Sequence, residues 1–376
     1  MNLPPFILVK RSREWRDCLV HLSSQSRLAI DLEANSMFAY RERVCLIQIS
    51  TAVHDYIIDP TVNLDLSGLG RLIADPTVEK VFHAAEYDLM LLKRQYGWKL
   101  KNLFDTMWAA RILGYRRFGL ASLLDELFNV RLNKRYQKSN WCRRPLAPEQ
   151  LAYAQHDTHF LLALRDVLMQ ELEEKGCVEE ARETFTQQSH VLLSDNGFDP
   201  DSFWSINGVR DLNKHQKAAL KALNIFRDKE ARRRDKPLFK IINDRTLLAL
   251  AQKRPSSFHE LGQVHGMTKG QIRRYGQSIL RVIRDANNAP VPKYPARKHK
   301  RQPEDVIMRY EKLRAWRKER AIKRGVESDV ILSRGALWEI AQKNPKNNLE
   351  LSRISSIGDW RCSTYGDEIL VILEEC

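Results

Sequence analysis

The sequence lacks the features that mark several large classes of protein. It contains no stretch of about 18 apolar residues, so we expect no membrane-spanning helix. No Gly-x4-Gly-Lys-Ser/Thr segment occurs, which excludes a P-loop motor domain. The apolar run at residues 6–9 is too short for the core of a signal peptide. We therefore expect a cytoplasmic protein that has no membrane as a partner.

Cysteine is scarce, and its positions follow no recognised pattern. The six cysteines are Cys18, Cys45, Cys142, Cys177, Cys362 and Cys376. The absence of any C-x-x-C spacing argues against a zinc knuckle and against a disulfide framework. We expect all six to be reduced and structural.

Basic residues greatly outnumber acidic residues in only one segment of the 376-residue chain, whose net charge is +15. Residues 1–200 hold 25 Lys and Arg against 26 Asp and Glu, and residues 301–376 hold 14 against 13. Residues 201–300 hold 23 against 8. An excess confined to one segment favours contact with a polyanion such as nucleic acid, and a merely soluble basic surface is the alternative. The length itself indicates two or three domains.

The second part of the sequence repeats itself at a spacing of 90 residues. Residues 223–255 align without a gap with residues 313–345. Each copy has apolar residues three to four positions apart, interrupted by Pro or Gly, which is typical of several short helices. Because the Pro-rich basic stretch 289–303 separates the copies, we predict two small all-α modules joined by a linker.

The first part of the sequence has the pattern of an α/β domain. Candidate strands lie at residues 27–34, 44–50, 55–59 and 80–85, and candidate helices at 86–97, 106–114, 120–129 and 148–176. Short turns between the first three strands favour an antiparallel arrangement. Residues 148–176 are predicted to form one long helix, because Pro148 stands near its start and Gly176 at its end. Strands followed by helices indicate a single domain of about 195 residues.

Four carboxylates and one tyrosine stand out within this domain. Asp31 and Glu33 alternate along a strand and therefore share a face, although that pair alone would more often belong to an edge strand with a solvated face. Asp88 follows a strand at the start of a helix, and Tyr153 and Asp157 are four residues apart on one helix face. Carboxylate oxygens are hard ligands, which suit Mg²⁺ or Mn²⁺ rather than zinc.

In this order and context, the set resembles the motifs of the DEDD superfamily of exonucleases, Tyr subtype. The three motifs are Asp31-x-Glu33, "HAAEYD" ending at Asp88, and Tyr153-x-x-x-Asp157. Ala152 stands where the His subtype would need histidine. The repeats resemble HRDC domains, and an exonuclease followed by two of them is the arrangement of the bacterial ribonuclease D family.

The resemblance implies a fold and a set of domains. The expected fold is an α/β ribonuclease H-like exonuclease domain, with a mixed sheet and flanking helices, followed by two all-α HRDC-like domains. The predicted boundaries are 1–200 for the exonuclease domain, 205–288 for the first HRDC-like domain, 289–303 for the linker and 304–376 for the second HRDC-like domain.

The ligand set predicts a two-metal mechanism. Two ions, Mg²⁺ or Mn²⁺, are expected, and their expected ligands are Asp31, Glu33, Asp88 and Asp157. The two ions would hold a phosphodiester between them during in-line attack by water. Tyr153 completes the catalytic set, because a phenol with an ordinary pKa near 10 is better suited to orient water than to remove its proton. The neighbouring histidines, His83, His156 and His159, are not expected to be ligands. Asp105 is expected to cap the next helix.

The expected partner is RNA, and the expected reaction is release of 5′-mononucleotides from its 3′ end. Precursors of tRNA and other stable RNAs are implied by the resemblance alone. The residues expected to bind nucleic acid are Arg232, Arg233, Arg234, Lys236, Arg273 and Arg274. Two alternatives stay open: an exonuclease acting on DNA, and a catalytically inactive RNA-binding protein. The oligomeric state is left open.

Overall fold

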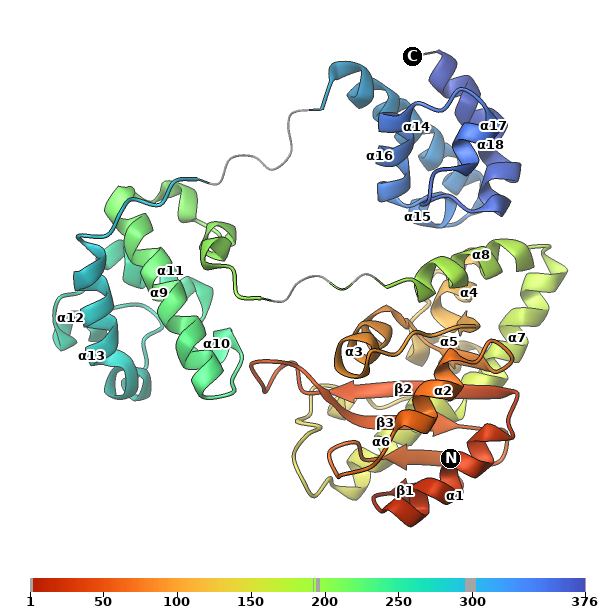
Figure 1. Cartoon of the computed structure of the whole chain (residues 1–376), viewed down its shortest axis with the longest axis horizontal. Coiled ribbons are helices and arrows are strands. Elements are labelled where there is room, and N and C mark those ends of the chain that lie inside the picture. Colours follow the sequence, from red (N-terminus) through yellow and green to blue (C-terminus); the bar gives the residue numbers. More distant parts are fainter. Residues whose placement is uncertain (1–2, 192, 194–196, 295–301, 376) are drawn as a thin grey trace. The chain divides into compact units, whose positions relative to one another are not determined.

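The structure is a computed structural model that describes residues 3–191, 193, 197–294 and 302–375. It has two compact units (Figure 1). One unit comprises Met1–Ala34, Val44–Leu193 and Arg301–Cys376, and the other comprises Asn35–Arg43 and Ser194–Lys300. The predicted linker 289–303 and Cys376 fall partly or wholly outside the described residues.

A mixed six-stranded sheet is the framework of the first unit. Its strands are β1 (Ile7–Val9), β2 (Arg27–Ala34), β3 (Val44–Ser50), β4 (Asp55–Ile58), β5 (Glu79–Phe82) and β6 (Leu103–Asp105), in the order β1-β4-β3-β2-β5-β6. Strands β2, β3 and β4 are consecutive antiparallel neighbours, which confirms the predicted arrangement. The pairs β1–β4, β2–β5 and β5–β6 are parallel. Strands β1 and β6 were not predicted, because three residues are too few to establish an alternating pattern.

Eight α-helices accompany the sheet in the described part of residues 3–191. They are α1 (Ser12–Ser23), α2 (Ser67–Ala74), α3 (Glu86–Tyr96), α4 (Thr106–Leu113), α5 (Leu120–Phe128), α6 (Pro148–His159), α7 (Leu161–Glu174) and α8 (Val178–Ser189). The prediction of one helix over 148–176 is wrong, because the chain turns at Phe160. The turn lets α6 pack against β3 and β4 while α7 packs against β2, β5 and α4. No Pro or Gly marks it, so the sequence pattern runs through the break unchanged.

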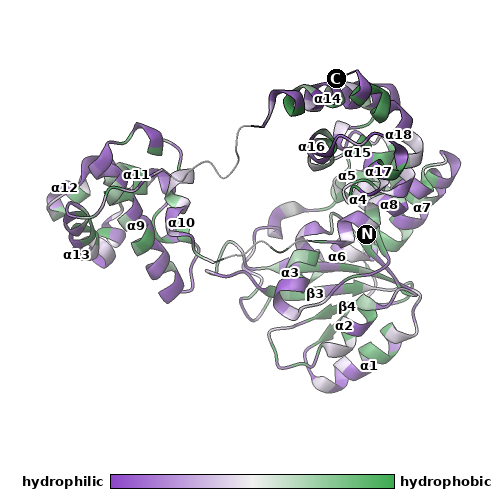
Figure 2. Cartoon of the chain, turned by 45° about the horizontal axis from the view of Figure 1, so that its top comes forward, coloured by the Kyte–Doolittle hydropathy of each residue, from purple (hydrophilic) through white to green (hydrophobic). Residues whose placement is uncertain are grey.

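The core of this unit lies on both faces of the central strands. All seven residues of β3 are buried, and much of the sheet has hydrophobic colours in Figure 2. Buried apolar residues of the surrounding helices complete this core. A smaller apolar cluster around Trp141 contains Leu46 of β3 and Ala154 of α6. This cluster holds α6 against β3, the strand that lies beside β2 in the sheet.

Two of the cysteines form a disulfide, which corrects the expectation that all are reduced. Cys45 and Cys142 are 97 positions apart in the sequence, yet their Cα atoms are 4.9 Å apart. Cys18, Cys177 and Cys362 are free thiols. Spacing along the chain could not reveal the bond, because only the fold brings these two segments together.

The two helical modules reproduce each other element by element. The first contains α9 (Lys214–Arg233), α10 (Leu238–Ile241), α11 (Asp244–Lys253), α12 (Phe258–Gly262) and α13 (Lys269–Ala286). The second contains α14 (Glu304–Arg324), α15 (Ser328–Ile331), α16 (Arg334–Lys343), α17 (Asn348–Ser352) and α18 (Asp359–Glu374). Helices α10, α11 and α12 recur as α15, α16 and α17 at the predicted offset of 90 residues. Short 3-10 turns at Pro200–Ser205 and Val209–Asp211 precede the first module.

The second module contacts α8 through buried charges. Glu180 is completely buried, and its carboxylate accepts hydrogen bonds from Arg324 at 2.9 and 2.7 Å. Arg361, also buried, donates to Glu183 at 2.6 Å. Arg111 of α4 donates to Glu327 at 2.7 Å. Several arginines of the second module are therefore engaged inside the protein.

Candidate active site

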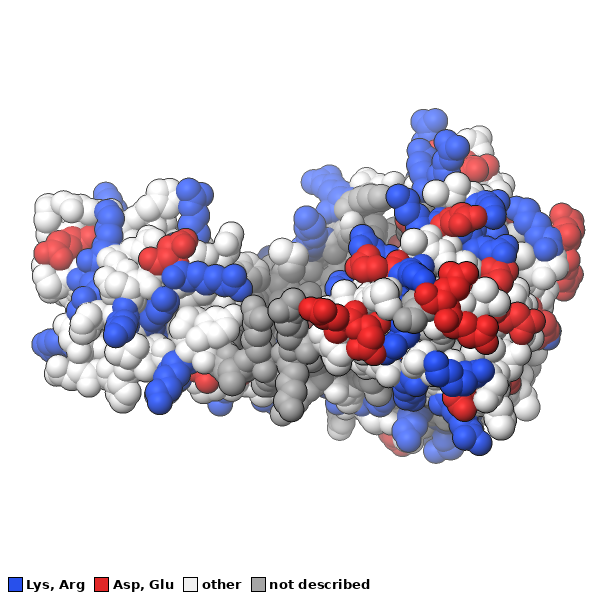
Figure 3. Space-filling model, turned by 90° about the horizontal axis from the view of Figure 1, so that it is seen from above, with Lys and Arg blue, Asp and Glu red and all other residues white. Residues whose placement is uncertain are grey.

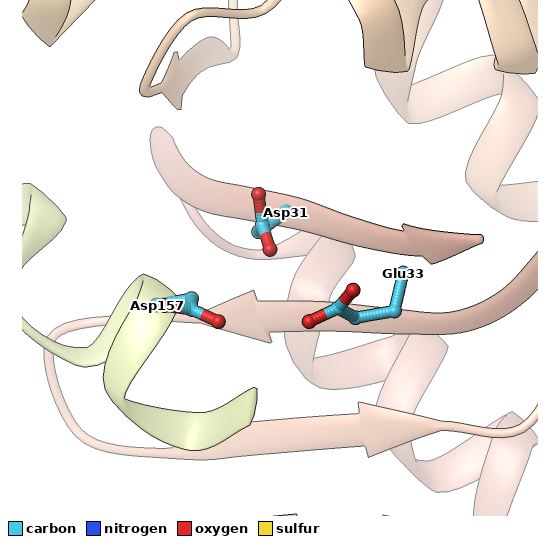
Figure 4. Close-up of side chains that lie close together, drawn as sticks. All are labelled: Asp31, Glu33 and Asp157. Atoms are coloured by element: carbon cyan, nitrogen blue, oxygen red, sulfur yellow. The ribbon is translucent and has the colours of Figure 1, made fainter. Parts of the chain in front are cut away.

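Strand β2 and helix α6 bring three carboxylates together. Asp31 and Glu33 leave the same face of β2, and Asp157 comes from α6 (Figure 4). Ligand oxygens of the three lie within 4.8 Å of one another. The register of β2 against β3 shifts between Glu33, which pairs with Leu46, and Ala34, which pairs with Val44, so an irregularity of the β-bulge kind lies directly beside the site.

Asp88 lies on the third residue of α3 and is 7% exposed. It is not one of the three clustered carboxylates, yet burial and then the charges of Asp31, Asp105 and Asp157 raise its pKa. Asp105 fixes the chain in front of α3, because its carboxylate accepts from the backbone N–H groups of Ala84 at 3.0 Å and Ala85 at 2.8 Å. It also accepts from the backbone N–H of the second residue of α4 and so caps that helix, which confirms the role predicted for it. Its link to Ala84 and Ala85 was not foreseen.

The four carboxylates share an environment that disfavours their negative charges: Asp88 is buried, and Asp31, Glu33 and Asp157 are partly buried. Burial raises the pKa of Asp31 to about 7. Burial, and then the charges of Asp31, Asp157 and Asp88, raises the pKa of Glu33 to about 10. Burial and the charge of Asp31 also raise the pKa values of Asp88 and Asp157. No described Lys or Arg forms an ion pair with any of the four, so the site is built to attract a cation from outside the chain.

Tyr153 stands one helical turn before Asp157, on the same side of α6. Its ring packs beside Trp141 at 5.9 Å and Tyr136 at 6.4 Å, measured between centroids. Burial and the charges of Asp157 and Glu33 raise the pKa of its hydroxyl above the ordinary value. The hydroxyl therefore stays protonated at neutral pH and can donate a hydrogen bond.

The donor set fits a hard divalent cation. Three oxygen ligands from carboxylates in one place suit Mg²⁺ or Mn²⁺. The nearby histidines have other partners: His83 bonds the Thr106 hydroxyl, His156 the Ala152 carbonyl and His159 the Asp55 carboxylate. None of them belongs to the carboxylate cluster.

One polar residue of this region was not predicted from the sequence. Gln48 of β3 is paired directly opposite Asp31 in the sheet. It is completely buried, and the strand around it is apolar from residue 44 to residue 49 except for this glutamine. Only the register of β2 against β3, which single-sequence patterns do not fix, places it beside the carboxylates.

The basic residues predicted to bind nucleic acid lie on the first module. Arg232 pairs with Asp228 at 3.2 Å, while Arg233 and Arg234 share Glu230 at 2.7 and 3.1 Å. Lys236, Arg273 and Arg274 are exposed. The guanidinium groups of Arg234 and Arg274 lie 5.1 and 5.9 Å from the centroid of the Tyr275 ring. Both predicted sets of basic residues, 232–236 and 273–274, therefore contact this ring.

Comparison with known proteins identifies the domains. The sequence matches the 3′-5′ exonuclease family over residues 6–173 and the HRDC domain over residues 216–283 and 307–373. It is 28% identical over 383 residues to ribonuclease D of Gluconacetobacter diazotrophicus, which covers 99% of this chain and 93% of that protein. It is 32% identical over 292 residues to protein RRP6-like 1 of Arabidopsis thaliana, covering 74% of this chain but 46% of that protein. The chain therefore spans about half the length of this second relative.

A solved structure shares the fold. The crystal structure of Escherichia coli RNase D, an exoribonuclease involved in structured RNA processing, has a TM-score of 0.67 and 24% identity over 99% of both chains. The expected fold, an α/β exonuclease domain followed by two helical HRDC domains, is thereby confirmed. Together, the domain matches and the full-length similarity show that this chain is a 3′-5′ exonuclease with two HRDC domains and a homologue of ribonuclease D.

Proposed function

We propose that this protein is a metal-dependent 3′-5′ exoribonuclease that releases 5′-mononucleotides from RNA. The observation that carries the proposal is the cluster of Asp31, Glu33 and Asp157, which has no basic partner among the described residues. The three residues lie within the range that matches the 3′-5′ exonuclease family, and ribonuclease D is among the relatives of this chain. Partly buried carboxylates that repel one another destabilise a fold. An RNA-binding protein without catalytic activity would gain no function that offsets this destabilisation.

Two ions would be held by the four carboxylates. Asp31, Asp157 and Glu33 would hold the ion that activates water, and Asp31 and Asp88 the ion nearer the leaving 3′ oxygen. When bound, such ions lower the pKa of water and neutralise charge on a phosphodiester. The chain itself contributes orientation: the protonated Tyr153 hydroxyl donates to the attacking water, and Asp105 keeps the start of α3 in place.

The substrate is proposed from charge and from the relatives. The ribonuclease D relative supports RNA rather than DNA, and the 3′ ends of tRNA precursors and other structured RNAs are the proposed targets. A cytoplasmic location is also proposed from the similarity to bacterial ribonuclease D. No helix of the described residues is long and apolar enough to cross a membrane.

The first HRDC domain is proposed to hold the RNA body. Lys and Arg side chains spread over its visible face, at the left of Figure 3. In the second HRDC domain, Arg324 and Arg361 bind carboxylates of α8, whereas Arg232 and Arg233 of the first domain stay more than half exposed although they pair with acidic residues of their own helix. The proposed phosphate contacts are therefore six cations of the first HRDC domain: Arg232, Arg233, Arg234, Lys236, Arg273 and Arg274.

The domain boundaries also stay a proposal. The exonuclease domain is placed at 1–200, the first HRDC domain at 205–288, the linker at 289–303 and the second HRDC domain at 304–376. The helices of the two HRDC domains, α9–α13 and α14–α18, fall within these limits.

Digestion of matched oligonucleotides tests the proposal. Single-stranded RNA and DNA of the same sequence, each labelled at the 5′ end, are incubated with the protein with and without Mg²⁺. The expected result is a ladder of RNA shortened from the 3′ end, dependent on Mg²⁺, with 5′-mononucleotides as the product. Faster digestion of the DNA would favour the DNA exonuclease instead, and no digestion of either would favour the inactive RNA-binding protein.

A further inference from the structure

Gln48 is a buried amide whose hydrogen-bonding groups have no partner among the described residues. It lies in the middle of β3 and is 0% exposed. Neither Nε2 nor Oε1 has a hydrogen-bond partner among the described protein groups. Buried polar groups are nearly always hydrogen-bonded, and an unpaired buried amide destabilises a fold. A position in a wholly buried strand would ordinarily be filled by an apolar residue, so this glutamine calls for an explanation.

The sheet register places Gln48 on the face of the carboxylates. Residues directly opposite each other in an antiparallel pair send their side chains to the same face. Because Gln48 is paired with Asp31, its side chain leaves the sheet on the side from which Asp31 and Glu33 also leave. Its partner on the other neighbouring strand is Ile57, which offers no polar side-chain atom.

The neighbours of Gln48 along β3 show what covers this face. Two residues on, the Ser50 hydroxyl donates to the Thr158 hydroxyl of α6 at 2.7 Å. Two residues back, Leu46 packs in the cluster that contains Ala154 and Tyr153 of α6. Gln48 therefore lies between two residues that contact α6 on either side of Asp157. Gln48 thus lies on the face of β3 that packs against α6, the helix that carries Asp157, and beside β2, the strand that carries Asp31.

We propose that Gln48 is a positioning residue for the metal site, an inference that rests on the function proposed above. When Asp31 and Asp157 are ionised and each holds an ion through one carboxylate oxygen, the Gln48 Nε2–H group donates to the other oxygen of one of these carboxylates. Its Oε1 accepts a hydrogen bond from water in the site. A carboxylate fixed in this way keeps its ligating orientation, and loss of such an outer partner typically lowers metal affinity by about 10- to 100-fold.

A second buried glutamine provides a matched control. Gln155 lies on α6, two residues before Asp157, and is 4% exposed. Its Nε2 donates to the Asp55 carboxylate at 2.6 Å and to the Pro4 carbonyl at 2.8 Å. Gln155 is therefore a suitable control, because it is also a buried glutamine near the site. Unlike that of Gln48, its amide has hydrogen-bond partners within the fold.

The test measures Mn²⁺ binding by calorimetric titration, without substrate, in wild type, Gln48→Met, Gln155→Met and Asp31→Asn. Methionine has the length of glutamine and no amide. For Gln48→Met we expect Mn²⁺ affinity about 10-fold lower or more, with an apo melting temperature equal to or above that of wild type. For Gln155→Met we expect the reverse: an unchanged Mn²⁺ affinity and a lower apo melting temperature.

Activity adds a second readout, because a positioning role makes the loss depend on metal concentration. The RNA hydrolysis rate of Gln48→Met should approach the wild-type rate as Mn²⁺ is raised. Unchanged Mn²⁺ affinity in Gln48→Met, beside normal binding by wild type, would overturn the inference and leave the proposed function intact. A lower apo melting temperature or failure to fold would overturn it too, because an unpartnered amide contributes no stabilising bond to lose. If wild type bound no Mn²⁺, the proposed function itself would fail.

Discussion

Asp31 and Asp157 come from a strand and a helix far apart in the sequence, and oxygens of their carboxylates lie within 4.8 Å of each other and of Glu33. Burial raises the pKa values of both aspartates, because it removes water that would solvate their charged forms, and the charge of Asp31 raises the pKa of Asp157 further. This pairing is the basis of the proposed mechanism. The fold holds it by packing α6 against β3, with Tyr153 one turn away on the same helix.

Replacing Tyr153 with Phe removes only the hydroxyl that is proposed to position the attacking water. We expect kcat to fall about 100-fold, the size typical of a positioned catalytic group, while Mn²⁺ affinity stays unchanged. Single-turnover hydrolysis of RNA measures the rate of the chemical step, and calorimetric titration measures the Mn²⁺ affinity. Tyr136→Phe is the control, because its ring packs against that of Tyr153 but belongs to another segment. Equal rates in both variants would return Tyr153 to a packing role.

Replacing Arg232, Arg233 and Arg234 together with Ala should weaken RNA binding most at low salt. Removing one cation that binds a phosphate of a single strand lowers the slope of log affinity against log salt by about 0.7, so the triple variant should lower it by about 2. Filter binding between low and moderate salt measures the slope. A matched variant with Ala at Arg314, Lys318 and Lys323 of the second HRDC domain should change it little. If this control lowered the slope more, the assignment of RNA binding to the first HRDC domain would be wrong.

Glu180→Gln should loosen the second HRDC domain from α8. Glu180 is completely buried against Arg324, and removing one partner of a buried ion pair destabilises by about 3–5 kcal/mol. We expect a decrease of about 3 kcal/mol in the free energy of unfolding, measured with urea. Glu179→Gln, which affects an exposed pair with Arg182, should cost less than about 1 kcal/mol. A Glu180→Gln protein as stable as wild type would show that this ion pair does not form.

Lys80 should make stability depend on pH in the alkaline range. Its ammonium group is buried and donates to the carbonyls of Asp75 and Val78, both at 2.6 Å. Burial lowers the pKa of Lys80 from 10.5 to about 8. Between these values the unfolded chain binds more protons than the folded chain, so the contribution of Lys80 to stability rises with pH across this window.

Lys80→Met provides the comparison for this pH dependence. The free energy of unfolding of wild type relative to Lys80→Met should increase from pH 8 to pH 10.5, by at most about 3 kcal/mol. Because other titrating groups are common to both proteins, their effects cancel in the difference. A difference that is flat across this range would contradict the burial of a charged Lys80.

Much of the fold and the site could be predicted because the relevant signals are local in sequence. The alternation around Asp31 and Glu33 and the four-residue spacing of Tyr153 and Asp157 determine which side chains share a face. The 90-residue repeat aligns helices of the two modules because each copy has the same short-range pattern. These features need no knowledge of which segments meet in space.

The remaining features depend on contacts between distant segments. The disulfide of Cys45 with Cys142, the pairing of Glu180 with Arg324 and the position of Gln48 opposite Asp31 all arise from tertiary packing. The turn at Phe160 is of the same kind, because packing of α6 and α7 on different strands produces it without a helix-breaking residue. Charge counts placed the basic excess in residues 201–300 but could not show that Arg233 and Arg234 share Glu230.

The most direct test of the carboxylate site is the hydrolysis rate of Asp31→Asn at saturating Mg²⁺, measured on labelled single-stranded RNA beside its RNA affinity. Asparagine keeps the shape of the side chain and removes the charge that holds an ion. We predict no detectable hydrolysis with RNA affinity within about twofold of wild type, and full activity in the control Asp17→Asn, an exposed aspartate of α1. Hydrolysis by Asp31→Asn at a rate near that of wild type would contradict the proposed metal site.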